Sequence, residues 1–350
     1  MNWEEYVRKV VPYVPGEQPK RKDIIKLNTN ENPYPPAPGV KRAYEAFELG
    51  QLRKYPDPSA EKLVGAIADF YGLKKEQVFV GVGSDDVLAM IFMTFFNSKV
   101  PVLFPDITYS FYDVWADMLR IPYEVQPLDE NFKIRKEDYR KENGGIIFPN
   151  PNAPTGVLMP LSEVEDIIAH NQESIVVVDE AYIDFGGESA LPLIEKYENL
   201  LVVQTFSKSR SMAGIRIGYA MGCEKLIRYI NDVKYSFNSY TMNQLTIELG
   251  AAAIADRAYF EDTTKKVVTT RERTKKALRE LGFVFEDSKS NFIFAHHERV
   301  PAEEIFEALK KEGIYVRHFT AERIHDYLRI SIGTDEEMDA LLSFLRTYLN

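Results

Sequence analysis

Residues 174–182 read SIVVVDEAY and residues 200–208 read LLVVQTFSK, and these two stretches decide the fold. In the first, four consecutive apolar residues lead directly to Asp179, and in the second the run LLVVQTF precedes Ser207 and Lys208. Short apolar runs without alternation are typical of strands that are buried on both faces of a sheet. The two stretches therefore predict strands of a helix-covered sheet that deliver a carboxylate and an amine at their ends.

Similar apolar runs, bounded by turn residues, recur in the first two thirds of the chain, at residues 78–83, 100–105, 145–150 and 216–222. Helical patterns separate most of them, as at residues 84–96 and 161–171, and we expect Ser162 to cap the second of these helices. Strands that alternate with helices predict an α/β domain with a mainly parallel central sheet. Ligands of such sheets bind at the carboxyl ends of the strands.

A different pattern begins near residue 243, where long helical stretches replace the alternation. The stretch at residues 262–281 is rich in charge, which we interpret as a solvated helix face. The short strands and helices after it, including a strand at residues 314–319, indicate a compact α+β unit. We therefore expect an arm at residues 1–27, a large domain at residues 28–250 and a smaller C-terminal domain at residues 251–350.

Composition narrows the choice of function. The 350 residues are 45% hydrophobic, enough for a large core, and their net charge of −10 argues against nucleic acid as a partner. Cys223 is the one cysteine, so no disulfide can form within the chain, which fits the cytoplasm. The charged, proline-broken N-terminus does not match a signal peptide, and no apolar run has the length of a membrane span. We therefore expect a cytoplasmic protein without nucleic-acid or membrane partners.

Polar groups at two strand ends suggest chemistry. Lys208, in a turn of small hydroxyl residues, could clasp a phosphate, form a Schiff base with a carbonyl, or project into solvent. A buried Asp179 needs a cationic partner to remain ionised, and the protonated nitrogen of a pyridine-based cofactor is such a partner. Otherwise Asp179 caps the next helix.

Further groups follow other strand ends. Gly83, Ser84 and Asp85 lie between a strand and a helix, where backbone N–H groups and the helix dipole favour an anion. The irregular loop NPNAPTG at residues 150–156 and the ring of Tyr109 also follow strand ends. Because these ends share one edge of the sheet, we expect the groups to form one binding site.

These motifs, in this order, resemble the fold-type-I pyridoxal-phosphate-dependent aminotransferases, and most of all the histidinol-phosphate aminotransferases. The resemblance covers nearly the whole chain and is carried by NENPY (30–34), YPDP (55–58), GSDDVL (83–88), NPNAPTG (150–156), VVVDEAYIDF (176–185), TFSKSRSMAGIRIGY (205–219), SNFIF (290–294) and LRISIGT (328–334). It implies a fold-type-I large domain, a smaller α+β domain and pyridoxal 5′-phosphate as cofactor. It also implies transamination between histidinol phosphate and 2-oxoglutarate in histidine biosynthesis, which yields imidazole-acetol phosphate and glutamate.

The resemblance assigns roles to individual residues. Lys208 would bind the cofactor as a Schiff base and shuttle the substrate proton. Asp179 would pair with the ring nitrogen, Tyr182 would bond to the ring oxygen O3′, and Tyr109 would stack on the ring. The groups expected to hold the cofactor phosphate are the backbone of Ser84 and Asp85 and the side chains of Thr205, Ser207 and Arg216.

The resemblance also assigns substrate and interface residues. Arg329 matches the arginine that binds the α-carboxylate of glutamate, and with Arg317 it would bind the phosphate of histidinol phosphate. Tyr13 and Asn30 match arm positions that close over the substrate. Tyr55 matches a tyrosine that the family contributes across a dimer interface, which implies a homodimer with a shared active site.

The chain departs from the superfamily pattern at two positions. Ala153 replaces an asparagine that bonds to O3′, so either Asn152 reaches the cofactor instead or Tyr182 serves alone. Val82 stands where the family often carries a polar residue beside the phosphate turn. His296 and His297 show no spacing typical of a metal site, and we expect no metal.

Three alternatives stay open. A threonine-phosphate decarboxylase or an aromatic amino acid aminotransferase could use the same scaffold and most of the same motifs. A regulator that uses this fold as a ligand sensor is disfavoured, because such proteins usually carry a DNA-binding module ahead of the domain and because Lys208 is intact.

Overall fold

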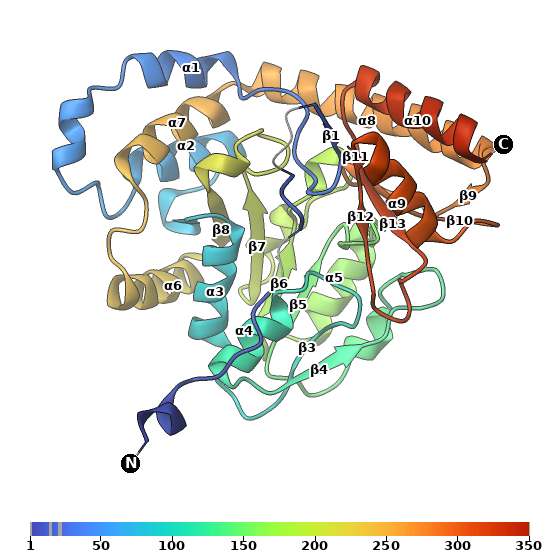
Figure 1. Ribbon diagram of the computed structural model, residues 1–350. Helices are drawn as coiled ribbons and strands as arrows, with labels where there is room; N and C mark the ends of the chain where they lie inside the picture. Colours follow the sequence, from blue (N-terminus) through green and yellow to red (C-terminus); the bar gives the residue numbers. More distant parts are fainter. Residues whose placement is uncertain (1, 14–15, 20–22, 350) are drawn as a thin grey trace.

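A seven-stranded sheet forms the centre of the computed structural model, which describes residues 2–13, 16–19 and 23–349 (Figure 1). From one edge to the other, its strands are β2 (Val78–Gly81), β8 (Gly218–Gly222), β7 (Leu200–Thr205), β6 (Val176–Asp179), β5 (Ile146–Pro149), β3 (Val102–Pro105) and β4 (Tyr123–Gln126). β8 is antiparallel to both of its neighbours, and the other neighbouring strands are parallel. The prediction of an α/β fold with a mainly parallel sheet is confirmed.

Helices cover both faces of this sheet because successive strand residues point to opposite sides. Val176 and Val178 pack in one apolar cluster, and Val177 packs in another. Burial of each such side chain contributes about 1.5–3 kcal/mol to folding, which explains why these strands are apolar throughout. One face is covered by α1 (Pro38–Glu45), α2 (Glu61–Tyr71), α5 (Leu161–His170) and α7 (Gln244–Ala255), and the other by α3 (Ser84–Phe95), α4 (Tyr112–Leu119) and α6 (Glu224–Phe237).

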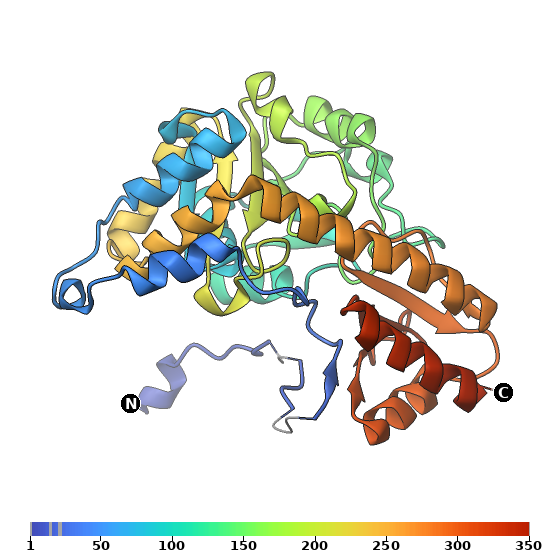
Figure 2. The same cartoon turned by 90° about the horizontal axis from the view of Figure 1, so that it is seen from above.

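A smaller unit lies at the far end of the long helix α8 (Arg257–Glu280) (Figure 2). Its antiparallel sheet contains, in order, β12 (Arg317–His318), β13 (Leu328–Ser331), β10 (Phe292–His297) and β9 (Phe283–Val284). With α9 (Ala302–Glu312) and α10 (Asp335–Leu349), this sheet encloses an apolar cluster of its own. Near the N-terminus, β1 (Ile25–Lys26) pairs in parallel with β11 (Ile314–Tyr315), so the N-terminal segment is attached to the smaller unit.

Short 3₁₀ helices complete the described part of the chain. They are η1 (Trp3–Tyr6), η2 (Leu49–Arg53), η3 (Lys75–Gln77), η4 (Lys136–Tyr139), η5 (Ile183–Phe185), η6 (Leu191–Glu195) and η7 (Ala213–Ile215). Within the described ranges, no helix has both the length and the apolar character needed to cross a membrane.

Two local predictions are wrong. The strand predicted at residues 314–319 is divided at Val316 into β11 and β12, which belong to different sheets. Helix α5 begins at Leu161, directly after Pro160 and without a side-chain cap, so Ser162 lies inside the first turn. Proline already holds the extended conformation that precedes a helix, so no capping serine is needed here.

The charged face predicted for residues 262–281 is partly buried. Arg271 and Lys275 are 2% and 3% exposed. Arg271 donates to the backbone oxygens of Phe185 at 2.7 Å and Ser290 at 2.9 Å, and it pairs with Glu272. A buried cation is tolerated when its donors are satisfied, and this one joins α8 to two loops that flank it.

Replacement of Arg271 by methionine keeps the apolar stem but removes the donor to the carbonyl groups of Phe185 and Ser290. We expect the free energy of unfolding in urea to fall by about 3 kcal/mol. Lys276→Met, at an exposed position of the same helix, is the matched control and should change it by less than about 0.5 kcal/mol. An equal loss in both variants would show that the buried hydrogen bonds are not the cause.

Candidate active site

A cavity of about 240 Å³ lies at the edge of the large sheet where its parallel strands end. β6 ends at Asp179 and β7 at Thr205, and the antiparallel β8 begins at Gly218, so all three strands deliver residues to this edge. The residues that line it are Thr29, Glu31, Ser84, Asp85, Tyr109, Pro149, Ala153, Asp179, Ala181, Tyr182, Thr205, Ser207, Lys208, Ala213 and Arg216. The structure thus brings Lys208 together with every residue predicted to bind the cofactor except Asn152 and Tyr55.

Asp179 is a buried carboxylate in the wall of this cavity. It accepts hydrogen bonds from the Tyr112 hydroxyl at 2.9 Å and from the backbone N–H of Ala181 at 3.2 Å. Burial raises the pKa of Asp179 to about 6, and Lys208 is near enough to oppose this shift without forming an ion pair. A cationic ring nitrogen would stabilise the ionised form at this position.

One end of the cavity is built by Arg216 and the start of α3. Gly83, with φ of +85°, precedes this helix, and a Cβ at Gly83 would collide with the Arg216 guanidinium. Arg216 donates to the Asp85 carboxylate at 2.8 Å, and the Tyr109 hydroxyl donates to the same carboxylate at 2.6 Å. The guanidinium and the N-terminal amides of α3 make this end suited to an anion.

Two hydroxyl groups lie beside that end. Thr205 Oγ1 donates to Ser207 Oγ at 3.0 Å and accepts from the backbone N–H of Ser207 at 3.1 Å. Thr205 also pairs with Gly218 across β7 and β8, and Gly218 packs so closely on the backbone of Ser84 that no side chain would fit. This close packing brings the two hydroxyl groups to the start of α3.

The amine of Lys208 reaches the cavity from the turn after β7. Its Nζ donates to the backbone oxygen of Thr29 at 3.2 Å and lies 5.5 Å from the centre of the Tyr182 ring. Asn32 donates to the backbone oxygen of Lys208 at 3.0 Å and so fixes the turn. The backbone is held while the amine keeps one long hydrogen bond, which suits a group that exchanges partners during a reaction.

Asn152 does not reach this cavity. Its amide donates to the backbone oxygen of Ile107 and to the Thr155 hydroxyl, each at 3.0 Å, and the residue lines a neighbouring cavity. Ala153 lines the main cavity instead. The geometry does not support the prediction that Asn152 binds the cofactor, because its donors are already used and directed elsewhere. Tyr182 remains as the candidate partner of the ring oxygen.

Arg317 and Arg329 lie directly opposite each other in the register of β12 and β13. Arg329 donates to the backbone oxygen of Asn28 at 3.1 Å, its buried Nε has no hydrogen-bond partner, and no described carboxylate forms an ion pair with either guanidinium. Burial lowers the pKa of Arg329 and Arg317 lowers it further, while the phenols of Tyr182 and Tyr13 act in the opposite direction. Two adjacent guanidinium groups without carboxylate partners form an anion site.

The two arm residues also approach the site. Tyr13 packs its ring against Phe111, with 4.3 Å between ring centres. Asn30 is buried, and its Nδ2 donates to the Tyr182 hydroxyl at 3.0 Å. Asn30 therefore contacts a residue that lines the cavity, whereas Tyr13 contacts Phe111, which is not one of them.

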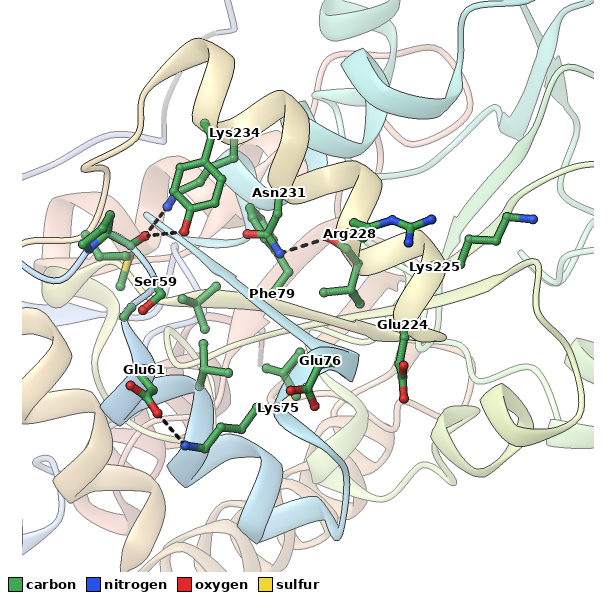
Figure 3. A pocket seen from close by; sticks show the side chains of 18 residues that line it. Ser59, Glu61, Lys75, Glu76, Phe79, Glu224, Lys225, Arg228, Asn231 and Lys234 are labelled. Carbon is green, nitrogen blue, oxygen red and sulfur yellow. Dashed lines mark hydrogen bonds and ion pairs between the residues drawn. The ribbon is translucent and has the colours of Figure 1, made fainter.

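Tyr55 lies away from the cavity of its own chain. Its side chain is 83% exposed and stacks on Tyr240 with 4.8 Å between ring centres. The segment that follows Tyr55 is anchored to α6, because the buried Lys234 of this helix donates to the backbone oxygen of Pro58. Lys234 lines a larger cavity, of about 780 Å³, between α2, α6 and the edge strand β2 (Figure 3). That cavity shares no lining residue with the candidate site and is separate from it.

Two buried residues near Asp179 are missed by sequence reasoning. Tyr112, which bonds to Asp179, follows Tyr109 by three residues across the turn before α4, and this spacing of two tyrosines was the available signal. Glu180 is 1% exposed, and its bond from Gln204 across neighbouring strands could not be read from the sequence. The predicted DEAY motif thus contains two carboxylates with different surroundings.

Glu180 makes the stability of the folded protein depend on pH. Its carboxylate accepts hydrogen bonds from the Ser189 hydroxyl, the backbone N–H of Ala190 and the amide of Gln204, yet burial raises its pKa to about 7. The folded state therefore binds one more proton than the unfolded chain between about pH 4.5 and about pH 7. Stability is lost as the pH rises through that window, because the raised pKa belongs to the folded state.

In Glu180→Gln this carboxyl is removed, so we expect its share of the pH dependence of stability to disappear, while that of Asp179 remains. Relative to this variant, the wild-type protein should lose about 2–3 kcal/mol of unfolding free energy between about pH 5 and about pH 8. Urea denaturation at a series of pH values measures both slopes. Glu198→Gln, at an exposed position, is the control and should keep the wild-type slope. Parallel slopes for wild type and Glu180→Gln would contradict the raised pKa.

Comparison of the sequence with known proteins identifies its family. The model of the class I and II aminotransferase family matches residues 22–345. A histidinol-phosphate aminotransferase of Lactococcus lactis subsp. cremoris is 51% identical over 349 residues, which cover 100% of this chain and 98% of that protein. One of Pseudomonas putida is 52% identical over 343 residues, which cover 98% of this chain and 99% of that protein.

A solved structure agrees with these relatives. The histidinol-phosphate aminotransferase from Sinorhizobium meliloti, crystallised in complex with pyridoxal-5′-phosphate, has a TM-score of 0.83 at 25% identity and covers 93% of this chain and 91% of its own. The fold-type-I architecture is thereby confirmed. The chain belongs to the class I and II aminotransferase family and, within it, to the histidinol-phosphate aminotransferases.

Proposed function

We propose that this protein is a pyridoxal-phosphate-dependent aminotransferase that transfers an amino group between histidinol phosphate and 2-oxoglutarate in histidine biosynthesis. The products in one direction are imidazole-acetol phosphate and glutamate. The observation that carries the proposal is the convergence of Lys208, the buried Asp179 and the anion-binding end at Arg216 on one cavity. The family of the chain supports the same reaction.

The residues present fit the cofactor. Asp179 is buried without an ion-pair partner among the described side chains, as expected of a carboxylate that faces a cationic ring nitrogen. Tyr182 would bond to the ring oxygen and Tyr109 would stack on the ring. The groups that would hold its phosphate are the amides of Ser84 and Asp85, the hydroxyls of Thr205 and Ser207, and the Arg216 guanidinium. When bound, the cofactor supplies an electron sink and a carrier for the amino group.

Lys208 is the catalytic residue of the proposal. Its amine would hold the cofactor through a Schiff base, and the same amine would move a proton to and from the substrate α-carbon. Its single hydrogen bond, to the backbone oxygen of Thr29, is long at 3.2 Å and easily exchanged. Asn32 holds the backbone of Lys208, so the amine can move while its base stays fixed.

Arg317 and Arg329 would bind the anionic group of each substrate. Guanidinium groups bind carboxylates and phosphates in the same forked geometry. Histidinol phosphate carries a phosphate and no carboxylate, whereas glutamate carries carboxylates, so a pair of arginines serves both. Tyr13 and Asn30, from the N-terminal segment, would cover the substrate and exclude water from the reacting atoms.

A homodimer completes the proposed site. Tyr55 does not line its own cavity, and its segment and the end of α6 carry further exposed apolar side chains, Leu49 at 74%, Leu52 at 56% and Phe237 at 68% exposure. A second copy packed on this surface would bury these residues and receive Tyr55 near its cofactor phosphate. We expect this dimer in the cytoplasm, where amino acids are synthesised.

The half-reaction tests the proposal. Protein loaded with pyridoxal phosphate should absorb above 400 nm, and histidinol phosphate without a keto acid should remove this band and yield stoichiometric imidazole-acetol phosphate. Lys208→Ala should lack the band and the product, because the amine that binds the cofactor is absent. No change with histidinol phosphate but carbon dioxide from threonine phosphate would instead assign the protein to the decarboxylases. Turnover of aromatic amino acids in preference to histidinol phosphate would move it to another aminotransferase.

Mixed subunits test the shared site. Tyr55→Ala and Lys208→Ala proteins should each be strongly impaired, and mixing them should restore up to about a quarter of wild-type activity, because a hybrid dimer contains one complete site. Tyr229→Ala, which alters another exposed tyrosine, is the control and should not need complementation. No recovery after proven exchange of subunits would exclude the contribution of Tyr55 to the partner.

A further inference from the structure

The replacement of an asparagine by Ala153 leaves Tyr182 with an unusual task. Ala153 lines the cavity and carries no donor, and the Asn152 amide is committed to Ile107 and Thr155. Tyr182 is then the remaining described side chain of this wall that could donate to a ring oxygen. Whether Tyr182 can donate to a ring oxygen depends on the direction of its one hydroxyl hydrogen.

Asn30 determines that direction. Its Nδ2 donates to the Tyr182 hydroxyl oxygen at 3.0 Å, so Tyr182 acts as acceptor in this bond. Among the described residues, none accepts the hydrogen of Tyr182. The hydroxyl hydrogen is therefore available to an acceptor in the cavity, and a hydroxyl group that already accepts a hydrogen bond becomes a stronger donor.

Ser331 favours this orientation of the Asn30 amide, because the reversed amide would leave the Ser331 hydroxyl hydrogen without the acceptor that it has here. The Oδ1 of Asn30 accepts a hydrogen bond from the Ser331 hydroxyl at 3.0 Å. The backbone N–H of Asn30 donates to Ser331 Oγ at 2.9 Å. Asn291 donates to the backbone oxygen of Asn30 at 3.0 Å. Asn30 itself is 1% exposed with φ of +56°, a conformation that asparagine tolerates better than most residues. All polar groups of Asn30 are thus assigned, and the amide faces Tyr182 with its nitrogen.

We propose that Asn30 is a positioning residue that makes Tyr182 a one-directional donor to the cofactor ring oxygen and so compensates for Ala153. The inference rests on the proposed function, since it needs pyridoxal phosphate in the cavity. The chain of donors runs from Ser331 to Asn30, from Asn30 to Tyr182, and from Tyr182 to the ring oxygen. In this role Asn30 acts on the ring oxygen only through the hydroxyl of Tyr182.

A hydrogen bond to the ring oxygen stabilises its negative charge, which is greatest in the deprotonated form of the bound cofactor. Loss of this bond therefore raises the pKa at which the visible absorption of the cofactor titrates. Removal of Asn30 weakens the bond from Tyr182 without removing Tyr182. A pH titration of the absorption above 400 nm measures this shift in pKa directly and does not depend on turnover.

The experiment compares variants of the loaded full-length protein. Asn30→Gly suits the positive φ and should raise the titration midpoint by about 0.4–1 pH unit, the effect of one hydrogen bond. Asn30→Asp keeps the bond from Ser331 but offers Tyr182 an acceptor in place of a donor, and should raise the midpoint further. In the Tyr182→Phe background, Asn30→Gly should have no effect, because the hydroxyl through which it acts is missing.

Asn291→Ala is the matched control, since it removes a bond to the backbone of Asn30 and none to Tyr182, and should leave the midpoint unchanged. An unshifted midpoint in Asn30→Gly, an equal shift in the Tyr182→Phe background, or an equal shift in Asn291→Ala would each overturn the inference. These results leave the proposed function intact, because the band is present. A wild-type protein that takes up the cofactor without any band above 400 nm would instead overturn the proposed function, and this inference with it.

Discussion

The burial of the Asp179 carboxylate is the constraint on which the site depends. β6 lies between β5 and β7, and its apolar residues pack on both faces of the sheet. Its last residue, Asp179, is therefore buried away from solvent. The Tyr112 hydroxyl and the Ala181 amide stabilise the carboxylate only in part, and its pKa rises to about 6. A protein that retains such a group at the end of its central sheet gains from a cationic ligand there.

The rest of the cavity complements this charge with the opposite sign. Arg216 and the amides at the start of α3 suit an anion at one end of it, while Arg317 and Arg329, which are not among the residues that line it, form a second cationic pair on the smaller unit. A ligand with a cationic ring and an anionic tail therefore has one favoured orientation. The Asp85 carboxylate accepts hydrogen bonds from Arg216 and Tyr109 and so keeps the Arg216 guanidinium in position at the anion-binding end.

Much of this arrangement could be predicted from the sequence, because buried parallel strands are continuous in apolar residues and their ends coincide. Lys208, Asp179 and Ser84 were placed correctly at one edge for that reason. Contacts between distant segments carried no such signal, as with the bond from Gln204 to Glu180 and the burial of Arg271 against the backbone of Phe185 and Ser290. Charge alone wrongly indicated a solvated face there, since a guanidinium can be buried when backbone oxygens satisfy it.

The single antiparallel neighbour of β7 has a consequence for how this site can change. Since Thr205 pairs with Gly218, the chain leaves the sheet edge at Thr205 and returns to the same edge, so Lys208 and Arg216 are carried by one closed connection. An insertion within residues 206–217 would displace the amine relative to the guanidinium while every strand kept its register. The length of this loop is therefore a constraint on the site in its own right, separate from the chemistry of the two side chains.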